Sequence, residues 1–204
     1  MIIKNIIFDF GGVLYKIDYK ATSKCLAKYS SDNNFNISLD EMLDLPDLYE
    51  KGLISDEIFI KELLSKYNLN CSDKEVENCW NAMLLGLKDE SIEFIKSIKT
   101  KYNIALFSNT NMIHYNKFYT ETRELLDNFD YVYLSFEIGL RKPEKESYLY
   151  VCEKSNFKIE ETVFIDDNLI NIKGAQLVGL KTIHFKTEDN LSSIFDTINI
   201  ITQL

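Results

Sequence analysis

The sequence has little of the chemistry that binds zinc or forms disulfide frameworks. It contains two histidines, His114 and His184, and neither lies near a pair of cysteines. We expect no zinc site, because structural zinc takes its ligands from closely spaced cysteines and histidines. The four cysteines are far apart in the chain, form no CxxC pair and follow no recognisable secretory signal. This pattern predicts reduced thiols in a cytoplasmic protein.

Long apolar runs and an excess of positive charge are also missing. No stretch is long enough to predict a membrane span. The formal net charge of -9 argues against nucleic acid or an anionic membrane as the main partner. No run of like charges stands out, so the acidity is expected on a solvated surface. At 204 residues the chain can bury a sizeable core, as one large domain or as a core with a small appendage.

The stretch from Ile6 to Gly12 carries the first chemical signal. Its apolar residues do not alternate with polar ones, which predicts a short strand buried on both faces. Asp9 follows that strand, and Gly11 and Gly12 allow a sharp turn and a close approach to a ligand. A buried carboxylate needs a metal, a partner or a reaction to offset its cost. A helix-capping role for Asp9 is the alternative, and this stretch alone leaves both interpretations open.

The rest of the chain shows two sequence patterns. Residues 19–87 show helical patterns without a strand signal, which predicts a small helical bundle inserted after the first strand. From residue 89 onward, helical patterns alternate with apolar runs at residues 104–107, 131–134, 162–165 and 180–185. This alternation predicts an α/β fold with a parallel sheet covered on both faces.

Polar side chains follow three of the predicted strands. In an open parallel sheet these strand ends share one edge, where ligands bind. A lysine enters the same edge from the loop after the third strand. The groups expected to meet there are Asp9, Ser108, Asn109, Lys142, Asp166 and Asp167.

Crowded carboxylates of this kind repel one another unless a cation joins them, and hard oxygen ligands favour Mg²⁺. Magnesium beside a lysine and a helix N-terminus suits a phosphate group. Asp166 and Asp167 are neighbours at a strand end, so their side chains are expected to diverge. We therefore expect one of them to contact the metal and the other to support the site.

The order and spacing of these motifs resemble the haloacid dehalogenase superfamily of phosphatases. Its four motifs correspond to Asp9 within Phe8 to Val13, Ser108-Asn109, Lys142-Pro143, and Asp166-Asp167 with Asn171. Within the superfamily, the chain is most similar to bacterial sugar-phosphate phosphatases of the glucose-1-phosphatase kind. The resemblance implies a Rossmann-like parallel-sheet core of residues 1–15 and 88–204. It also implies an inserted α-helical cap domain of residues 16–87.

The resemblance also implies roles for individual residues. Asp9 is expected to attack phosphorus and form an aspartyl-phosphate that water then hydrolyses. The Ser108 hydroxyl and the Asn109 backbone N–H are expected to bind the phosphoryl oxygens. Lys142 is expected to neutralise charge on the nucleophile and in the transition state.

The metal site implied by the resemblance holds Mg²⁺ through Asp9, the carbonyl of Gly11 and Asp167. Asp167 takes this role because it aligns with the usual aspartate of the family. Asp166 and Asn171 are expected to support the metal shell without contacting the ion.

One position departs from the family pattern. Most of these phosphatases carry a second aspartate two residues after the nucleophile, which protonates the leaving oxygen and activates water. This chain has Gly11 there. General acid–base help is typically worth roughly 10²–10⁴-fold, so its loss favours substrates with a good leaving group, such as a sugar 1-phosphate. Asp18 and Glu50 are candidate substitutes.

These observations favour a Mg²⁺-dependent phosphatase acting on a small phosphorylated metabolite, with a sugar phosphate preferred. A catalytically weak or inactive phosphate-binding regulatory protein is the alternative suggested by Gly11. A 2-haloacid dehalogenase, which needs no metal, is less consistent with the paired Asp166 and Asp167. The sequence indicates a small phosphate ester as partner, and it determines neither the substrate nor the oligomeric state.

Overall fold

The structure is a computed structural model that describes residues 2–31, 35, 44–186 and 189–203. At its centre lies a five-stranded sheet with the strand order β5-β4-β1-β6-β7, and every neighbouring pair runs parallel. The strands are β1 (Asn5–Phe8), β4 (Asn103–Ser108), β5 (Tyr131–Leu134), β6 (Thr162–Asp166) and β7 (Lys181–His184). The predicted Rossmann-like α/β fold is confirmed.

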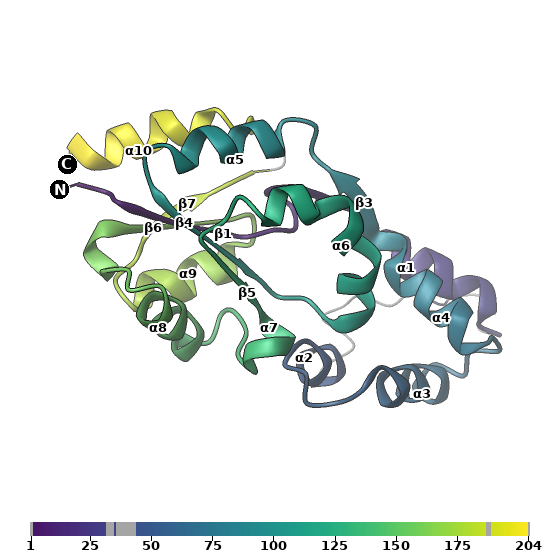
Figure 1. The fold of residues 1–204 in the computed structure, drawn as a ribbon. Helices are drawn as coiled ribbons and strands as arrows, with labels where there is room; N and C mark the ends of the chain where they lie inside the picture. Colours follow the sequence, from purple (N-terminus) through teal and green to yellow (C-terminus); the bar gives the residue numbers. More distant parts are fainter. Residues whose placement is uncertain (1, 32–34, 36–43, 187–188, 204) are drawn as a thin grey trace.

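The side chains of the central strands point alternately into two hydrophobic cores. Ile6 and Phe8 of β1 belong to one core and Ile7 to the other. The helices on the first face are α5 (Ser91–Lys99), α6 (Met112–Leu126) and α10 (Ser193–Gln203). Those on the second face are α8 (Lys145–Lys154) and α9 (Leu169–Leu177). Figure 1 shows α5 and α10 on one side of the sheet and α8 and α9 on the other. Burial on both faces explains why the strand sequences are continuously apolar.

In the sequence, a group of helices follows β1 and precedes the other strands of the five-stranded sheet. These helices are α1 (Tyr19–Leu26), α2 (Asp44–Glu50), α3 (Asp56–Lys66) and α4 (Asp73–Trp80). They pack around clusters of their own, centred on Phe59, Leu63 and Trp80 and on Leu26 and Cys79. Ser55 and Ser72 accept hydrogen bonds from backbone N–H groups in the first turns of α3 and α4, as their sequences predict.

The expectation of no strand between residues 19 and 87 is wrong. The strand β3 (Leu84–Leu87) pairs antiparallel with β2 (Tyr15–Ile17) in a two-stranded ribbon. The run at 84–87 is too short and too similar to the adjoining helical pattern to be recognised, because the pairing joins segments about 70 residues apart. In the sequence, Pro46 follows the helical pattern of residues 39–45 and predicts an interruption there. It lies in the first turn of α2, where proline is tolerated, while residues 39–43 of that pattern lie outside the described residues.

The expectation that all four cysteines are reduced is also wrong. A disulfide joins Cys25 of α1 to Cys79 of α4, 54 residues apart in sequence. The two helices pack against each other and bring the two cysteines together, which sequence spacing does not show. Cys71 and Cys152 are free thiols. The cysteines therefore give no support to a cytoplasmic location. Within the described residues, no helix has both the length and the apolar character needed to cross a membrane.

Candidate active site

The first two aspartates of the site meet because their strands are neighbours. Strands β1 and β6 pair in parallel with Phe8 opposite Ile165, so Asp9 and Asp166 leave the same edge of the sheet. The backbone N–H of Asp9 donates to the carbonyl of Ile165 over 2.8 Å. One carboxylate oxygen from each of Asp9, Asp166 and Asp167 lies within 4.8 Å of the others. The structure thus brings together the three carboxylates that the sequence predicts.

Lys142 lies between two of these carboxylates. Its Nζ is 2.5 Å from Oδ1 of Asp9 and 2.8 Å from Oδ2 of Asp166, and its side chain is 1 % exposed. Burial lowers the pKa of Lys142, but the charges of Asp166 and Asp9 outweigh it and hold the pKa above the usual value. The lysine is therefore an ammonium fixed on the predicted nucleophile.

The loop that carries Lys142 is tied to the end of β4. The side-chain oxygen of Asn109 accepts from the Lys142 backbone N–H, and its amide nitrogen donates to the Lys142 carbonyl, each over 2.9 Å. These two hydrogen bonds use the Asn109 side chain. What remains for a ligand at that residue is its backbone.

Asp166 and Asp167 have different surroundings. Both oxygens of Asp166 accept hydrogen bonds, from Lys142, from the backbone of Asn168 and from the amide of Asn171, at 2.8–3.1 Å. The carboxylate of Asp167 lies against Gly12, whose φ of +77° and lack of a side chain leave it room, since a Cβ there would overlap Asp167. Asp166 is thus a fully partnered supporting group, whereas Asp167 faces the cluster.

The electrostatics of the cluster favour a cation. Burial raises the pKa of Asp9 well above its usual value, Asp166 and Asp167 raise it further, and Lys142 opposes them. Burial and the charge of Asp166 raise the pKa of Asp167 to about 6. Three carboxylates with one buried ammonium leave an excess of negative charge. The oxygen donors present therefore fit Mg²⁺.

The end of β4 supplies the predicted phosphate-binding residues. Ser108 is the last residue of the strand and is buried beside the cluster's edge of the sheet. Asn111 caps α6 by accepting from the backbone N–H of His114 over 3.0 Å. Sequence reasoning missed Ser135, whose hydroxyl accepts from the Thr110 backbone N–H and donates to its carbonyl. The signal was present, because Ser135 directly follows β5, as Asp9 and Asp167 follow their own strands.

The side chain of Ile17 fills the space beside Gly11. A Cβ built on Gly11 would overlap Cδ1 of Ile17, while Cγ1 of Ile17 would be 3.6 Å away. The place where a second catalytic aspartate would begin is therefore occupied by a methyl group.

The two candidate substitutes for that aspartate have different surroundings. Asp18 is exposed and caps α1, accepting from the backbone N–H of Lys20 over 3.0 Å. Glu50, at the end of α2, accepts from Nε and NH2 of Arg141 at 3.0 and 2.8 Å. Burial raises the pKa of Glu50, and the charges of Arg141 and Lys142 oppose that rise. Glu50 is therefore held next to the loop of Lys142, because Arg141 directly precedes that lysine in the chain.

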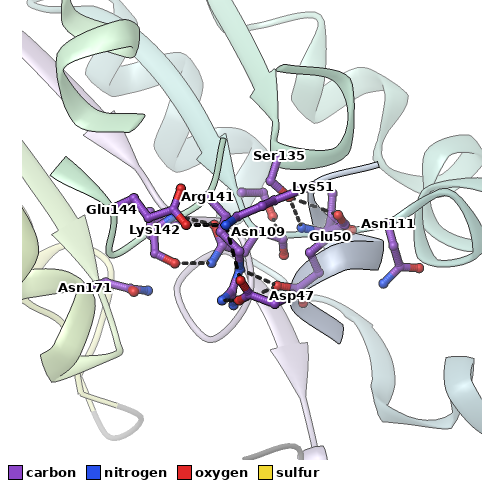
Figure 2. Close-up of polar contacts among 12 residues, drawn as sticks. Asp47, Glu50, Lys51, Asn109, Asn111, Ser135, Arg141, Lys142, Glu144 and Asn171 are labelled. Atoms are coloured by element: carbon purple, nitrogen blue, oxygen red, sulfur yellow. Dashed lines mark hydrogen bonds and ion pairs between the residues drawn. The ribbon is translucent and has the colours of Figure 1, made fainter. Parts of the chain in front are cut away.

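Glu50 belongs to an ionic network that Figure 2 shows in full. Arg141 also pairs with Asp47, and Lys51 pairs with Asp47 at 3.2 Å and with Glu144. The network joins α2 to the loop of Lys142. No sequence signal could have shown it, since Glu50 and Arg141 are 91 residues apart.

Comparisons with known proteins agree with this geometry. A family model described as haloacid dehalogenase-like hydrolase matches residues 3–179. A D-ribitol-5-phosphate phosphatase from Bacteroides thetaiotaomicron is 27% identical over 186 residues, which cover 88% of this chain and 90% of that protein. A sesquiterpene phosphatase from Aspergillus oryzae is 24% identical over 205 residues, which cover 97% of this chain and 96% of that protein.

A solved structure is also similar over almost the whole chain. It is a HAD family enzyme from Bacteroides thetaiotaomicron in complex with magnesium and inorganic phosphate. It is 30% identical and superimposes with a TM-score of 0.83, over 95% of this chain and 99% of that chain. The resemblance inferred from the four motifs thus extends to the fold.

Proposed function

The chain belongs to the haloacid dehalogenase-like hydrolase family, and from this premise we propose that it is a Mg²⁺-dependent phosphatase acting on a small phosphate monoester. The observation that carries the proposal is the contact of one buried lysine with the predicted nucleophile. Lys142 is hydrogen-bonded to Asp9, beside two further carboxylates whose arrangement fits magnesium. Homologous phosphatases and the magnesium and phosphate in a similar structure support it.

In the proposed first step, a carboxylate oxygen of Asp9 attacks phosphorus. The new bond joins Asp9 to the phosphoryl group, and the bond from phosphorus to the ester oxygen breaks with its electron pair on that oxygen, which takes a proton from water and leaves as the alcohol. Lys142, fixed 2.5 Å from Asp9, offsets the negative charge that gathers as the phosphoryl group approaches a carboxylate. The Ser108 hydroxyl and the Asn109 backbone N–H bind the phosphoryl oxygens.

In the second step, water attacks phosphorus and the bond from phosphorus to Asp9 breaks. Inorganic phosphate leaves and the Asp9 carboxylate is restored. Asp166 holds Lys142 in place throughout, and Asn171 holds Asp166.

Asp9, the Gly11 carbonyl and Asp167 are the groups that we propose as magnesium ligands, with Asp166 and Asn171 supporting them. When bound, Mg²⁺ supplies positive charge to the phosphoryl oxygens and to the crowded carboxylates. The protein's own contribution is to fix these carboxylates at the edge of a rigid sheet before substrate arrives.

We propose a division into a core of residues 1–15 and 88–204 and a helical cap of residues 16–87. The separate hydrophobic clusters of the helices support it. So does the β2–β3 ribbon, because its two strands lie where the chain enters and leaves the proposed cap. A cap that closes over the site would exclude water until the phosphoryl group has been transferred.

The proposed substrate is a sugar phosphate or sugar-alcohol phosphate. Its support is the homologous D-ribitol-5-phosphate phosphatase. We propose neither nucleic acid nor membrane as a partner. We propose a cytoplasmic location, because phosphorylated metabolites are charged and stay in the compartment that makes them.

A second candidate function is phosphate binding without rapid turnover, as in a regulatory protein. Ile17 favours it, since its side chain takes the place of a second catalytic carboxylate. A 2-haloacid dehalogenase would give the carboxylates Asp166 and Asp167 no metal to bind, so the acidic cluster argues against it.

Phosphate release from p-nitrophenyl phosphate, hexose phosphates and pentitol phosphates, with Mg²⁺ or with EDTA, tests the proposal. We expect turnover that needs Mg²⁺ and disappears in Asp9→Asn. The matched control is Asp89→Asn, which removes a carboxylate from an almost fully exposed side chain and should leave the rate unchanged. Stabilisation by these phosphates without turnover would instead support the regulatory candidate. Activity surviving in Asp9→Asn would show that the nucleophile is assigned wrongly.

A further inference from the structure

An ionic network joins α2 to the loop of Lys142, and we call it the α2 wall of the site. Its members are Asp47, Glu50, Lys51, Arg141 and Glu144, so it is acidic although it contains an arginine. Glu50 ends α2, and its Oε2 is held by both Nε and NH2 of Arg141. The side chains of Glu50 and Arg141 are 19 % and 24 % exposed, so each is largely withdrawn from water. Arg141 directly precedes Lys142 in the chain, so its contacts hold Glu50 next to the loop that carries the catalytic lysine.

The positive charges of this wall are already paired. Arg141 contacts Asp47 as well as Glu50, and Lys51 contacts Asp47 and Glu144 (Figure 2). Two cations thus face three carboxylates, which leaves one negative charge in excess. An anionic group on a substrate would find no unpaired cation in this network.

Two further cations, Lys142 and Lys88, are engaged as well. Lys142 is held by Asp9 and Asp166, and Lys88 donates to the Gly12 carbonyl over 2.6 Å. The segments 32–34, 36–43 and 187–188, which the structure does not describe, contain neither lysine nor arginine.

Tyr19 provides the complementary observation. It is the first residue of α1, and its side chain is 53 % exposed. Tyr19 is two residues from Ile17, whose side chain lies beside Gly11. Partial burial and the charges of Asp167, Asp9 and Glu50 raise the pKa of the Tyr19 hydroxyl, so the phenol stays protonated. A phenol and a carboxylate at the rim of a site are suited to hydrogen-bond hydroxyl groups.

We propose that Glu50, held by Arg141, determines specificity by admitting phosphate monoesters whose remaining part is uncharged and hydroxylated. Substrates whose tail carries a carboxylate or a second phosphate are rejected, because their charge meets the unpaired negative charge of this wall. The inference rests on the proposed phosphatase function and names the substrate class of that site.

Two matched substrate pairs test it. Ribitol 5-phosphate is compared with ribonate 5-phosphate, and glucose 1-phosphate with glucuronate 1-phosphate. Each pair differs by the exchange of one CH₂OH group for a carboxylate. For the wild type we expect kcat/KM to favour the uncharged member by at least about tenfold, since like charges brought together at a site are strongly unfavourable.

Two variants separate specificity from a merely structural role. Glu50→Gln removes the negative charge and leaves Arg141 less neutralised, so the preference should shrink by about tenfold or reverse. Arg141→Gln keeps Glu50 negative, so the preference should persist or grow even where the overall rate falls. If the network only held α2 in place, both variants would change both substrates alike. Glu57→Gln, an exposed carboxylate on α3, is the control and should leave the preference unchanged.

The outcomes distinguish this inference from the proposed function. No Mg²⁺-dependent release of phosphate from either uncharged substrate or from p-nitrophenyl phosphate would overturn the proposed function. Efficient hydrolysis of charged and uncharged members alike by the wild type would leave the phosphatase standing and overturn the role of Glu50. So would an unchanged preference in folded Glu50→Gln.

Discussion

Gly11 and Ile17 occupy the place where a second catalytic carboxylate would lie. A carboxylate two residues after Asp9 would be placed to protonate the leaving oxygen, and here a glycine and the end of an isoleucine side chain take that place. The backbone at Gly11 is not in the left-handed region, so the conflict with a larger residue is only with Cδ1 of Ile17. A carboxylate could therefore be introduced if that methyl group were removed.

We predict that Gly11→Asp alone is destabilised by about 1–3 kcal/mol, because its Cβ overpacks against Ile17. Adding Ile17→Val removes Cδ1 and should restore most of that stability. The double variant should also hydrolyse alkyl phosphates faster, by up to roughly 10²-fold, because a general acid helps a poor leaving group most. Urea unfolding and the ratio of alkyl to aryl phosphate turnover measure the two effects.

Ile17→Val alone is the control, and it should change neither the ratio nor the stability by much. An unchanged ratio in the folded double variant would show that the space beside Gly11 is not where the leaving oxygen lies.

The junction of α6 with α4 is held by one buried histidine. His114 stacks on Trp80 with ring centroids 5.3 Å apart, and its Nε2 lies 3.1 Å from the Trp80 carbonyl. Because a carbonyl only accepts, Nε2 carries the proton and donates, while Nδ1 accepts from the Asn111 amide. Burial lowers the pKa of His114 to about 4. The neutral ring thus ties α6, the helix after the residues that we propose bind phosphate, to the neighbouring helical group.

This histidine should make stability depend on pH in a defined window. Its pKa is lower in the folded than in the unfolded protein, so the unfolded chain binds the proton first as the pH falls. The contribution of neutral His114 to the free energy of unfolding is therefore present above about pH 6.5, and it is lost progressively as the pH falls towards 4. Between pH 7 and pH 5 the loss attributable to His114 should be about 2 kcal/mol.

Urea unfolding of the wild type and of His114→Gln at these two pH values measures that difference. The variant should be less stable at pH 7 and should lose about 2 kcal/mol less than the wild type on acidification. The exposed His184 is the control site, and His184→Gln should retain the wild-type dependence. Equal losses in the wild type and His114→Gln would contradict a buried neutral histidine.

At the scale of the whole molecule, the features that can be predicted from the sequence are those that local residue patterns encode. The continuous apolar runs predict buried parallel strands, and the rule that ligands bind at strand ends brings Asp9, Ser108 and Asp167 to one edge. The same rule could have included Ser135, which also follows a strand.

The features that sequence reasoning missed depend on contacts between distant segments. The β2–β3 pairing, the Cys25–Cys79 disulfide and the pairing of Glu50 with Arg141 each join residues that no local pattern relates. Tertiary packing creates them, within the helical group for the disulfide and between that group and the core for Glu50 and Arg141, and such packing cannot be derived from composition or periodicity. The wall that we propose to select the substrate is therefore the part that only the structure supplies.

The central claim is that Asp9 becomes phosphorylated during turnover. Acid-quenching the enzyme with substrate and Mg²⁺, reducing it with borohydride and mapping its peptides by mass spectrometry tests this most directly, since reduction converts an aspartyl-phosphate into homoserine. We predict homoserine at position 9 only when substrate is present. Its appearance at another aspartate, or its absence while phosphate is being released, would contradict the account.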